Sequence, residues 1–478
     1  MIWNGSPLGF ERAGRPISYN ADDDGSGNAP TLILGPQGSA KTVGLVCTEL
    51  LDEPGLRSFV VFDPKGEICA ITSAYRRRVS NVKIINPYGL LVDERPDMAS
   101  DRWNPLGDLE PDALSFGDES QAKAEAIIKS DSNQSQRHFP DSARSGVTAV
   151  IMREVTQARA HGVAPPSFPN VREILTLPSD LLRPIIQEMV DCGDYDISTR
   201  AAKFMADNTE IQNIKSTVET ETGFMTRAIR EDMSTAAGVD FRECHQRPTT
   251  IYIIIPPGEL KGKACYIRLI WSSALRALYR YGGVPTTLLI EEAFVLGYHE
   301  EIEQALSVLR GFGSRLTIVF QSYTQIKKLY AQTHGLFTAG AMLAFRPADL
   351  ETAEMLVKKA GKIVVPVLSA SEPRPGEPGP HIGWTQRERD RIPLNKMLGM
   401  PKGRALVWKP HDEAPRMSWV KGYFEIPELN AKASPNPYFN PGRQNQGGGS
   451  GETPRGRSWR DEFNAGRRRV RDAFERRS

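Results

Sequence analysis

A short apolar run, a glycine-rich loop and a helical pattern follow one another near the amino end, and this order strongly constrains the fold of the 478-residue chain. The apolar run is Thr31–Leu34, the helical pattern is Val43–Leu51, and the loop between them reads Gly35-Pro36-Gln37-Gly38-Ser39-Ala40-Lys41-Thr42. Small residues let successive backbone N–H groups surround a phosphate, and the amino end of the helix adds a favourable dipole. In a Walker A loop of this kind the lysine reaches the β- and γ-phosphates and the next hydroxyl binds Mg²⁺. We therefore predict an ATP and Mg²⁺ site in which this loop binds the phosphates, Lys41 is catalytic and Thr42 is a metal ligand.

The loop departs from the usual pattern at one position, because Ala40 stands where glycine normally precedes the lysine. Alanine adds only a methyl group, and we expect it to be tolerated there if its backbone φ is negative. The competing interpretation is a glycine-rich turn that carries a surface lysine.

A pair of acids follows a second apolar run, Thr287–Ile290, in the manner of a Walker B segment. Ligands of parallel sheets collect at the carboxyl ends of the strands. We predict that Glu291 holds Mg²⁺ through a water molecule and that Glu292 orients or deprotonates the attacking water. Glu291 replaces the commoner aspartate. The alternative is that the acids only begin a solvated helix.

Two further candidate positions lie downstream of the acids. The apolar run Leu316–Phe320 ends at Gln321, whose amide we predict to sense the γ-phosphate. Arg310 and Arg315 flank a Gly-Phe-Gly turn, and either could reach a neighbouring subunit's phosphate. We take Arg310 as the catalytic candidate, with solvated surface arginines as the alternative.

Apolar strand-like runs alternate with helical patterns over much of the chain, which is typical of an α/β protein with a mostly parallel sheet. The alternation stops between about residues 101 and 242, where helical periodicity and polar loops predict an inserted all-α domain. The predicted domains are a nucleotide-binding domain (1–100 and 245–430), the all-α domain (101–244), and a flexible linker with a basic tail (431–478). The further runs that predict strands are Phe59–Phe62, Val82–Ile85 and Ile251–Ile255.

Composition limits how the chain can contact DNA and indicates its cellular compartment. The formal net charge is +2, so any contact with DNA must be a local patch. Five well-separated cysteines favour a reducing cytoplasm, and no stretch approaches the ~20 apolar residues that cross a bilayer. After Pro435 the composition is that of a flexible linker, and Ser458–Arg477 is either an amphipathic basic helix or a disordered basic terminus.

Several motifs appear in the order typical of one family. The chain reads Asp63-Pro64-Lys65-Gly66-Glu67, then Asn86-Pro87-Tyr88-Gly89, then Arg102-Trp103-Asn104-Pro105-Leu106, and later has Glu291-Glu292 with Gly297, and Gln321 with Gln325 and Tyr330. This series resembles the VirD4/TraG coupling ATPases of type IV secretion systems. The fold implied by the motifs and the resemblance is α/β, with a RecA-like P-loop NTPase core and an inserted all-α domain. Asp63 falls at a strand end near the nucleotide, so we include it among the nucleotide-binding residues.

The resemblance implies a function and partners. ATP hydrolysis in a homo-hexameric ring would move DNA, single- or double-stranded, while the all-α domain selects a relaxase or other secreted substrate for the type IV secretion channel. Lys261 and Lys263 are candidate DNA contacts. Two alternatives stay open: a nucleotide-binding cargo adaptor with little hydrolysis, and a soluble DNA translocase or helicase unrelated to secretion.

The resemblance also raises the question of anchoring. Family members usually carry amino-terminal membrane helices, whereas here the phosphate-binding loop begins at Gly35. We expect a cytoplasmic chain that reaches the inner membrane through a separate anchor subunit. The expected docking segments are the residues before Thr31 and the basic tail.

Overall fold

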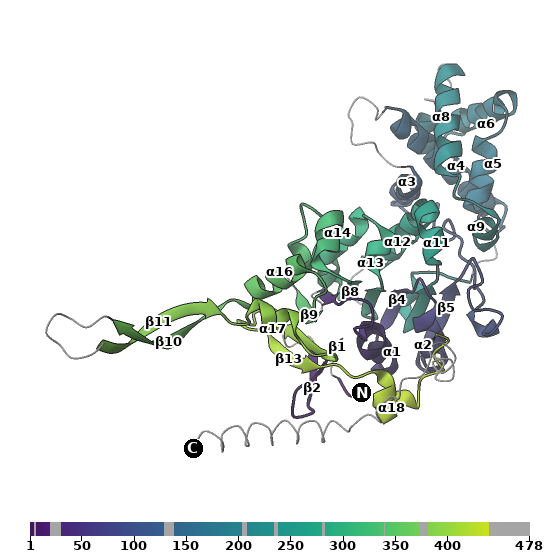
Figure 1. Ribbon diagram of the computed structural model, residues 1–478. Helices are drawn as coiled ribbons and strands as arrows, with labels where there is room; N and C mark the ends of the chain where they lie inside the picture. The colour runs from purple at the N-terminus through teal and green to yellow at the C-terminus, as the bar shows by residue number, and fades with distance from the viewer. Residues whose placement is uncertain are drawn as a thin grey trace, which may run out of the picture. The chain divides into compact units, whose positions relative to one another are not determined.

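The computed structural model describes residues 1–3, 6–19, 30–128, 138–202, 208–233, 238–279, 283–338, 340–371 and 381–438 (Figure 1). The chain divides into one compact unit, Met1–Pro435, and a second unit, Asn436–Ser478. The predicted basic tail, Ser458–Arg477, lies outside the described residues.

An eleven-stranded sheet forms the core of the first unit, in the order β2-β1-β13-β12-β9-β3-β8-β7-β4-β6-β5. The seven strands from β9 to β5 are parallel to one another. This arrangement confirms the predicted α/β class with a mostly parallel sheet. The parallel strands are β3 (Thr31–Leu34), β4 (Ser58–Phe62), β5 (Asn81–Ile85), β6 (Thr249–Ile253), β7 (Thr286–Ile290), β8 (Arg315–Phe320) and β9 (Ala341–Phe345).

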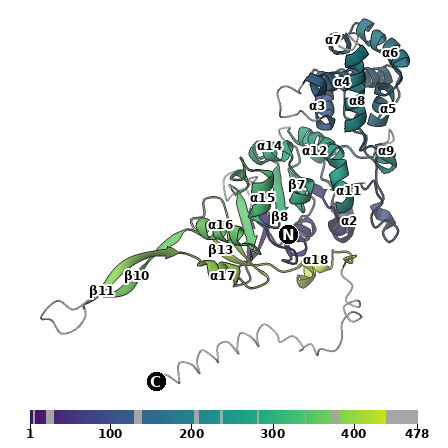
Figure 2. The same cartoon turned by 45° about the horizontal axis from the view of Figure 1, so that its top comes forward.

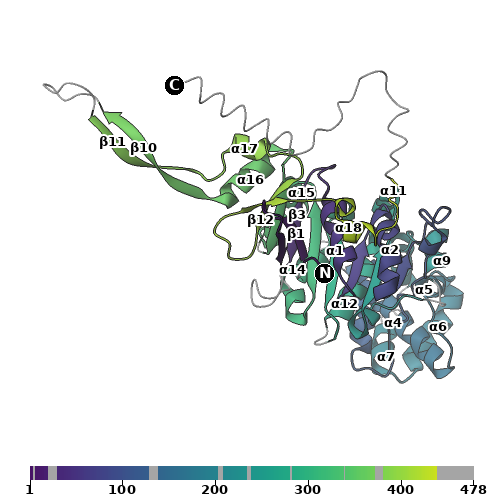
Figure 3. The same ribbon diagram turned by 90° about the horizontal axis from the view of Figure 1, so that it is seen from below.

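Helices cover both faces of this sheet (Figure 2 and Figure 3). Successive side chains of a strand point to opposite faces, so Leu32 and Leu34 belong to one hydrophobic core and Ile33 to the other. The first core includes α12 (Ala264–Leu278), and the second includes α1 (Cys47–Asp52) and α2 (Glu67–Val79). Burial on both faces explains why the central strands end in runs of consecutive apolar residues, such as Leu288–Ile290 of β7.

Four antiparallel strands extend the sheet beyond β9, and the sequence motifs did not indicate them. They are β12 (Arg404–Trp408), β13 (Arg416–Trp419), β1 (Ser6–Phe10) and β2 (Pro16–Tyr19). Docking through the amino-terminal segment, where it is expected to be exposed, is excluded for β1 but stays a prediction for the exposed turn Arg12–Arg15. Every residue of β1 is buried, and Trp3 and Tyr19 join the hydrophobic core, because this segment completes the edge of the sheet.

Between β5 and β6 the described residues form helices, with one isolated bridge between Trp103 and Val239. The segment contacts the rest of the unit at several points; in α3, for example, Lys123 Nζ lies 2.8 Å from Ser273 Oγ of α12. The division into compact units does not separate these helices from the sheet, so the boundaries of the all-α domain stay predictions. The helices are α3 (Phe116–Ile127), α4 (His138–Ala160), α5 (Phe168–Leu175), α6 (Ser179–Asp191), α7 (Tyr195–Ala202), α8 (Asn208–Glu221), α9 (Arg227–Asp232) and α10 (Glu243–Gln246).

The remaining elements follow β6 in the sequence. Two of them, β10 (Lys362–Ser371) and β11 (His381–Asp390), pair with each other in a separate two-stranded sheet. In the part of the chain that the structure describes, no helix has the length and apolarity needed to cross a membrane. The other helices are α11 (Pro257–Leu260), α13 (Ala293–Leu296), α14 (Glu300–Val308), α15 (Tyr323–Leu329), α16 (Leu350–Ala360), α17 (Leu394–Leu398) and α18 (Pro427–Asn430).

Candidate nucleotide site

The strand order brings four functional segments to one edge of the sheet. Strand β8 lies between β3 and β7, and β4 is the next strand beyond β7. In register, Leu34 pairs with Phe320, and Ile290 pairs with both Ile318 and Phe62. Because these strands are parallel, the glycine-rich loop, Gln321, the two acids and the Asp63 turn all follow the carboxyl ends of neighbouring strands.

The glycine-rich loop closes on its own lysine. Lys41 Nζ donates a hydrogen bond to the carbonyl oxygen of Pro36 at 3.3 Å, and only 5% of the lysine is exposed. One turn of π-helix, Thr42–Val46, follows and continues into α1. The loop therefore directs a buried amino group and the first helical residues towards the same small volume, as a phosphate site requires.

Ala40 does not have the backbone conformation on which we based its tolerance. Its φ is +66°, so the condition for strain-free tolerance is not met. In this left-handed region the Cβ atom crowds the backbone, and the cost for a non-glycine residue is about 1 kcal/mol. The closure of the loop imposes the angle, which explains why glycine is usual at this position.

Replacing Ala40 with glycine is therefore expected to stabilise the protein by about 1 kcal/mol, because the strain at positive φ is relieved. The measurement is the midpoint of urea unfolding. Gly38→Ala is the matched control, since Gly38 also has positive φ (+77°) and an added Cβ would meet no atom within 4 Å. It should shift the midpoint in the opposite direction. A lower midpoint for Ala40→Gly would contradict the assigned backbone conformation.

Thr42 and Glu291 meet directly, although 249 positions separate them in the sequence. The Thr42 hydroxyl donates a hydrogen bond to Glu291 Oε1 at 2.6 Å. Burial raises the pKa of Glu291 above its usual value, while the Thr42 hydrogen bond and the charge of Lys41 act in the opposite direction. The second oxygen, Oε2, is buried and has no hydrogen-bond partner among the described residues.

These two side chains fit Mg²⁺. The ion prefers oxygen ligands, and here a hydroxyl oxygen and a carboxylate lie in contact beside the phosphate loop. The buried, unpaired Glu291 Oε2 is the kind of acceptor that a cation or its water shell satisfies. Thr42 and Glu291 are the residues that would hold the ion.

Glu292 lies between two partners from the neighbouring strands. Lys65 Nζ lies 3.2 Å from its Oε1, and Gln321 Nε2 donates to its Oε2 at 3.1 Å. The backbone of Glu292 is left-handed, with φ 59° and ψ 48°, at the start of α13. Non-glycine residues in this conformation are uncommon and cluster at functional sites.

Asp63 is buried within the turn that follows β4. Its Oδ2 accepts a hydrogen bond from the backbone N–H of Cys69 at 2.8 Å, and burial raises its pKa to about 7. The carboxylate thus shapes the turn into α2. Direct contact of Asp63 with nucleotide stays a prediction.

The two flanking arginines have different environments. Arg315 is 3% exposed, and its guanidinium group contacts Glu49 Oε1 at 2.6 Å and Thr287 Oγ1 at 3.2 Å. The suggestion that Arg315 reaches another subunit is therefore wrong, because the side chain is buried and bound to Glu49 and Thr287 of its own chain. Arg310 is exposed on the short 3₁₀ helix Leu309–Phe312, which precedes the amino end of β8.

The two candidate DNA-contacting lysines also differ. Lys263 is buried, and its Nζ donates to the carbonyl oxygen of Phe224 at 3.1 Å. Its proposed contact with DNA is wrong, because the amino group fixes the helical segment to the core. Lys261 is exposed.

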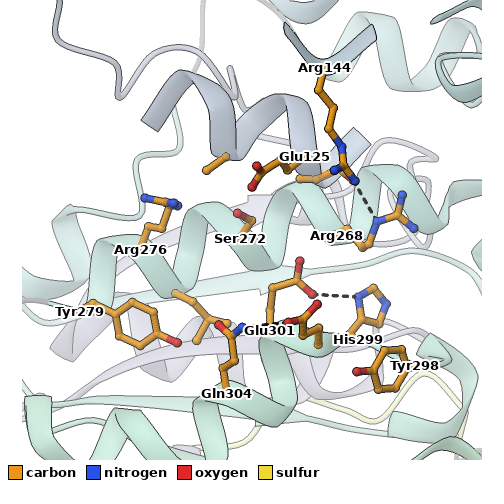
Figure 4. Close-up of a pocket in the computed structure, with 14 residues that line it drawn as sticks. Glu125, Arg144, Arg268, Ser272, Arg276, Tyr279, Tyr298, His299, Glu301 and Gln304 are labelled. Carbon is orange, nitrogen blue, oxygen red and sulfur yellow. Dashed lines mark hydrogen bonds and ion pairs between the residues drawn. The ribbon is translucent and has the colours of Figure 1, made fainter. Parts of the chain in front are cut away.

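A large cavity lies elsewhere in the first unit, beside α3, α12 and α14, with a volume of about 790 Å³ (Figure 4). No residue of the predicted nucleotide site lines it. Its buried Arg268 donates to the carbonyl oxygens of Ala126 at 2.9 Å and Ile127 at 3.2 Å, in the last turn of α3, where helix carbonyls lack intrahelical donors. We assign this arginine a structural role.

The phosphate loop, the buried acid beside Thr42 and the polar strand end between them define a P-loop NTPase with a RecA-like core. The family model for conjugative DNA transfer of the type IV secretory system matches residues 12–379. The chain belongs to this family, as its motifs predicted.

Curated relatives are distant in sequence. The conjugal transfer protein TraG of Escherichia coli is 24% identical over 367 residues, which cover 71% of this chain and 56% of the relative. Protein VirD4 of Rhizobium radiobacter is 22% identical over 355 residues, which cover 71% of this chain and 49% of the relative. The chain thus spans about half the length of these relatives.

Solved structures share the fold. The bacterial conjugative coupling protein TrwBdeltaN70 superposes with a TM-score of 0.62 at 14% identity, over 87% of this chain and 88% of that chain. The plasmid coupling protein TrwB in complex with the ATP analogue ADPNP gives 0.61 at 14% identity, over 87% and 89%. At this level of identity the likeness establishes the RecA-like architecture.

Proposed function

We propose that this chain is an ATP-hydrolysing coupling protein that drives conjugative DNA transfer. The observation that carries the proposal is the contact between Thr42 and Glu291 beside the buried Lys41, with Glu292 next to them. This set contains a phosphate cradle, a place for Mg²⁺ and a carboxylate base. Family membership and the nucleotide complex of TrwB support the same activity.

In the proposed reaction, water attacks the γ-phosphorus and the bond to the β–γ bridging oxygen breaks, giving ADP and phosphate. Lys41 stabilises the charge that spreads over the phosphoryl oxygens. Glu292 accepts the proton of the attacking water, and Gln321 orients that carboxylate and senses the γ-phosphate. Thr42 and Glu291 would hold Mg²⁺, which would supply positive charge to neutralise the phosphates.

The assembly and the partners belong to the same proposal. In a homo-hexameric ring, the exposed Arg310 of one subunit would complete the neighbour's site. DNA would run along basic loops that include Lys261, while the helical segment between β5 and β6 receives a relaxase or another secreted substrate. A secretion channel or a separate anchor subunit would hold the ring at the inner membrane.

The proposal predicts Mg²⁺-dependent ATP turnover that DNA stimulates and that salt suppresses, because phosphate contacts release counterions. Phosphate release is measured with and without DNA at several salt concentrations. Lys261→Ala should reduce the slope of log DNA affinity against log salt concentration by about 1, the value expected for the loss of one phosphate contact. Lys402→Ala is the control, since Lys402 is also an exposed lysine.

Each other outcome selects an alternative function. ATP binding without turnover would favour the nucleotide-binding adaptor. The strained backbone of Ala40 in the phosphate-binding loop is the observation that favours this alternative. DNA-stimulated turnover in a protein whose loss leaves conjugation intact would favour a translocase or helicase unrelated to secretion.

A further inference from the structure

The lysine of the Asp63–Glu67 turn has no role in the reaction as described so far. Lys65 follows β4, and Glu292 follows the adjacent strand β7. The distance from Lys65 Nζ to Glu292 Oε1 is 3.2 Å, and Gln321 of the next strand, β8, holds the other carboxylate oxygen at 3.1 Å. Three neighbouring strand ends thus supply a cation and an amide that each contact the carboxylate between them.

The turn that carries Lys65 is fixed on both sides. Asp63 accepts the Cys69 N–H at 2.8 Å, and the Gly66 N–H donates to the Asp63 carbonyl at 3.1 Å. Gly66 has φ +68°, and an added Cβ would lie 3.3 Å from the side chains of Leu91 and Met98. Aspartate and glycine are therefore needed for the shape of the turn, which presents Lys65 towards Glu292.

The pair is poorly suited to a stabilising role. The Lys65 side chain is 45% exposed and the Glu292 side chain 13% exposed. Because Lys65 is on the solvent side, water and salt screen its attraction to Glu292 and reduce the contribution of the pair to folding stability. Burial acts to lower the pKa of Lys65, but the charge and hydrogen bond of Glu292 outweigh it and raise the pKa, so the lysine is cationic.

The carboxylate, in contrast, gains orientation from the pair. A glutamate side chain has three rotatable bonds, and a base that drifts by about 1 Å can cost ~100-fold in rate. Lys65 and Gln321 occupy one lone pair on each oxygen and leave others for the attacking water. The left-handed backbone of Glu292 fixes the start of the same side chain.

We propose that Lys65 is a positioning residue for the catalytic base: with Gln321 it holds the Glu292 carboxylate in the orientation that receives the proton of the attacking water. The inference rests on the proposed ATPase function. It assigns a task to the lysine of the Asp-Pro-Lys-Gly-Glu motif that differs from that of Lys41, whose amino group lies within the phosphate loop.

The test compares steady-state ATP turnover of Lys65→Met, Lys65→Arg and the wild type. We expect Lys65→Met to lower kcat by about 10- to 100-fold, with KM, nucleotide affinity and the unfolding midpoint unchanged. Lys65→Arg should recover most of the rate, because arginine keeps a charged hydrogen-bond donor. In a Glu292→Gln background, Lys65→Met should cause less than about a twofold further loss, since both changes act on the same group. Lys402→Met is the matched control and should have wild-type kcat.

The outcomes separate the two proposals. If the wild-type protein hydrolyses ATP and Lys65→Met has the same kcat, the positioning role is wrong but the ATPase proposal stands. A fall in kcat that is fully additive with Glu292→Gln, or that tracks a lower unfolding midpoint, would also overturn it. Absence of turnover in the wild type would overturn the ATPase proposal and this inference with it.

Discussion

Replacing Lys41 with alanine is expected to reduce ATP turnover by at least about 1,000-fold while the fold persists. Lys41 supplies the positive charge nearest the transferred phosphoryl group, and that interaction is strongest in the transition state. The fold should survive because the residue removed contributes one hydrogen bond, to the Pro36 carbonyl at 3.3 Å. Phosphate release measures the turnover, and circular dichroism with a urea titration measures the fold.

The matched control for this variant is Lys402→Ala, which removes an exposed lysine. It should turn over ATP at the wild-type rate. If Lys41→Ala hydrolyses ATP as fast as the wild type, the assignment of the phosphate-binding loop is wrong.

Replacing Glu292 with glutamine is expected to lower kcat by about 100- to 10,000-fold while ATP still binds. The amide keeps the size of the side chain, and its oxygen can still accept a hydrogen bond from Lys65, but it cannot take the proton of the attacking water. The variant should therefore remain in the ATP-bound state. Equilibrium binding of a fluorescent ATP analogue and single-turnover hydrolysis measure the two properties separately.

Glu291→Gln is the paired variant, because it changes the adjacent acid in the same way. The contact of Glu291 with the Thr42 hydroxyl at 2.6 Å leads us to expect a raised Mg²⁺ requirement rather than a simple loss of proton transfer. If Glu291→Gln abolishes hydrolysis at saturating Mg²⁺ and Glu292→Gln does not, the two acids have been assigned in the wrong order.

Local sequence predicted six of the seven parallel strands and missed β9. The predicted strand Thr31–Leu34 has the observed bounds of β3, and the other five predicted parallel strands differ by one or two residues at their ends. These strands are buried on both faces, so their apolar runs are visible without knowledge of their neighbours. In contrast, β1 and β13 have no comparable run of Val, Ile and Leu, and only pairing with each other across more than 400 positions places them in the sheet.

The sequence by itself determined the phosphate loop, the acids and the glutamine at strand ends, because each depends on a few consecutive residues and on the period of a strand. Tertiary structure decided which of these side chains meet. The order of the strands, which arises from long-range pairing, places Lys65, Glu292 and Gln321 in contact. Arg315 and Lys263 are buried against segments distant in sequence, so they cannot have the roles predicted for them. Closure of the phosphate loop gives Ala40 its positive φ. Packing and backbone closure involve the whole chain, so no local pattern encodes them.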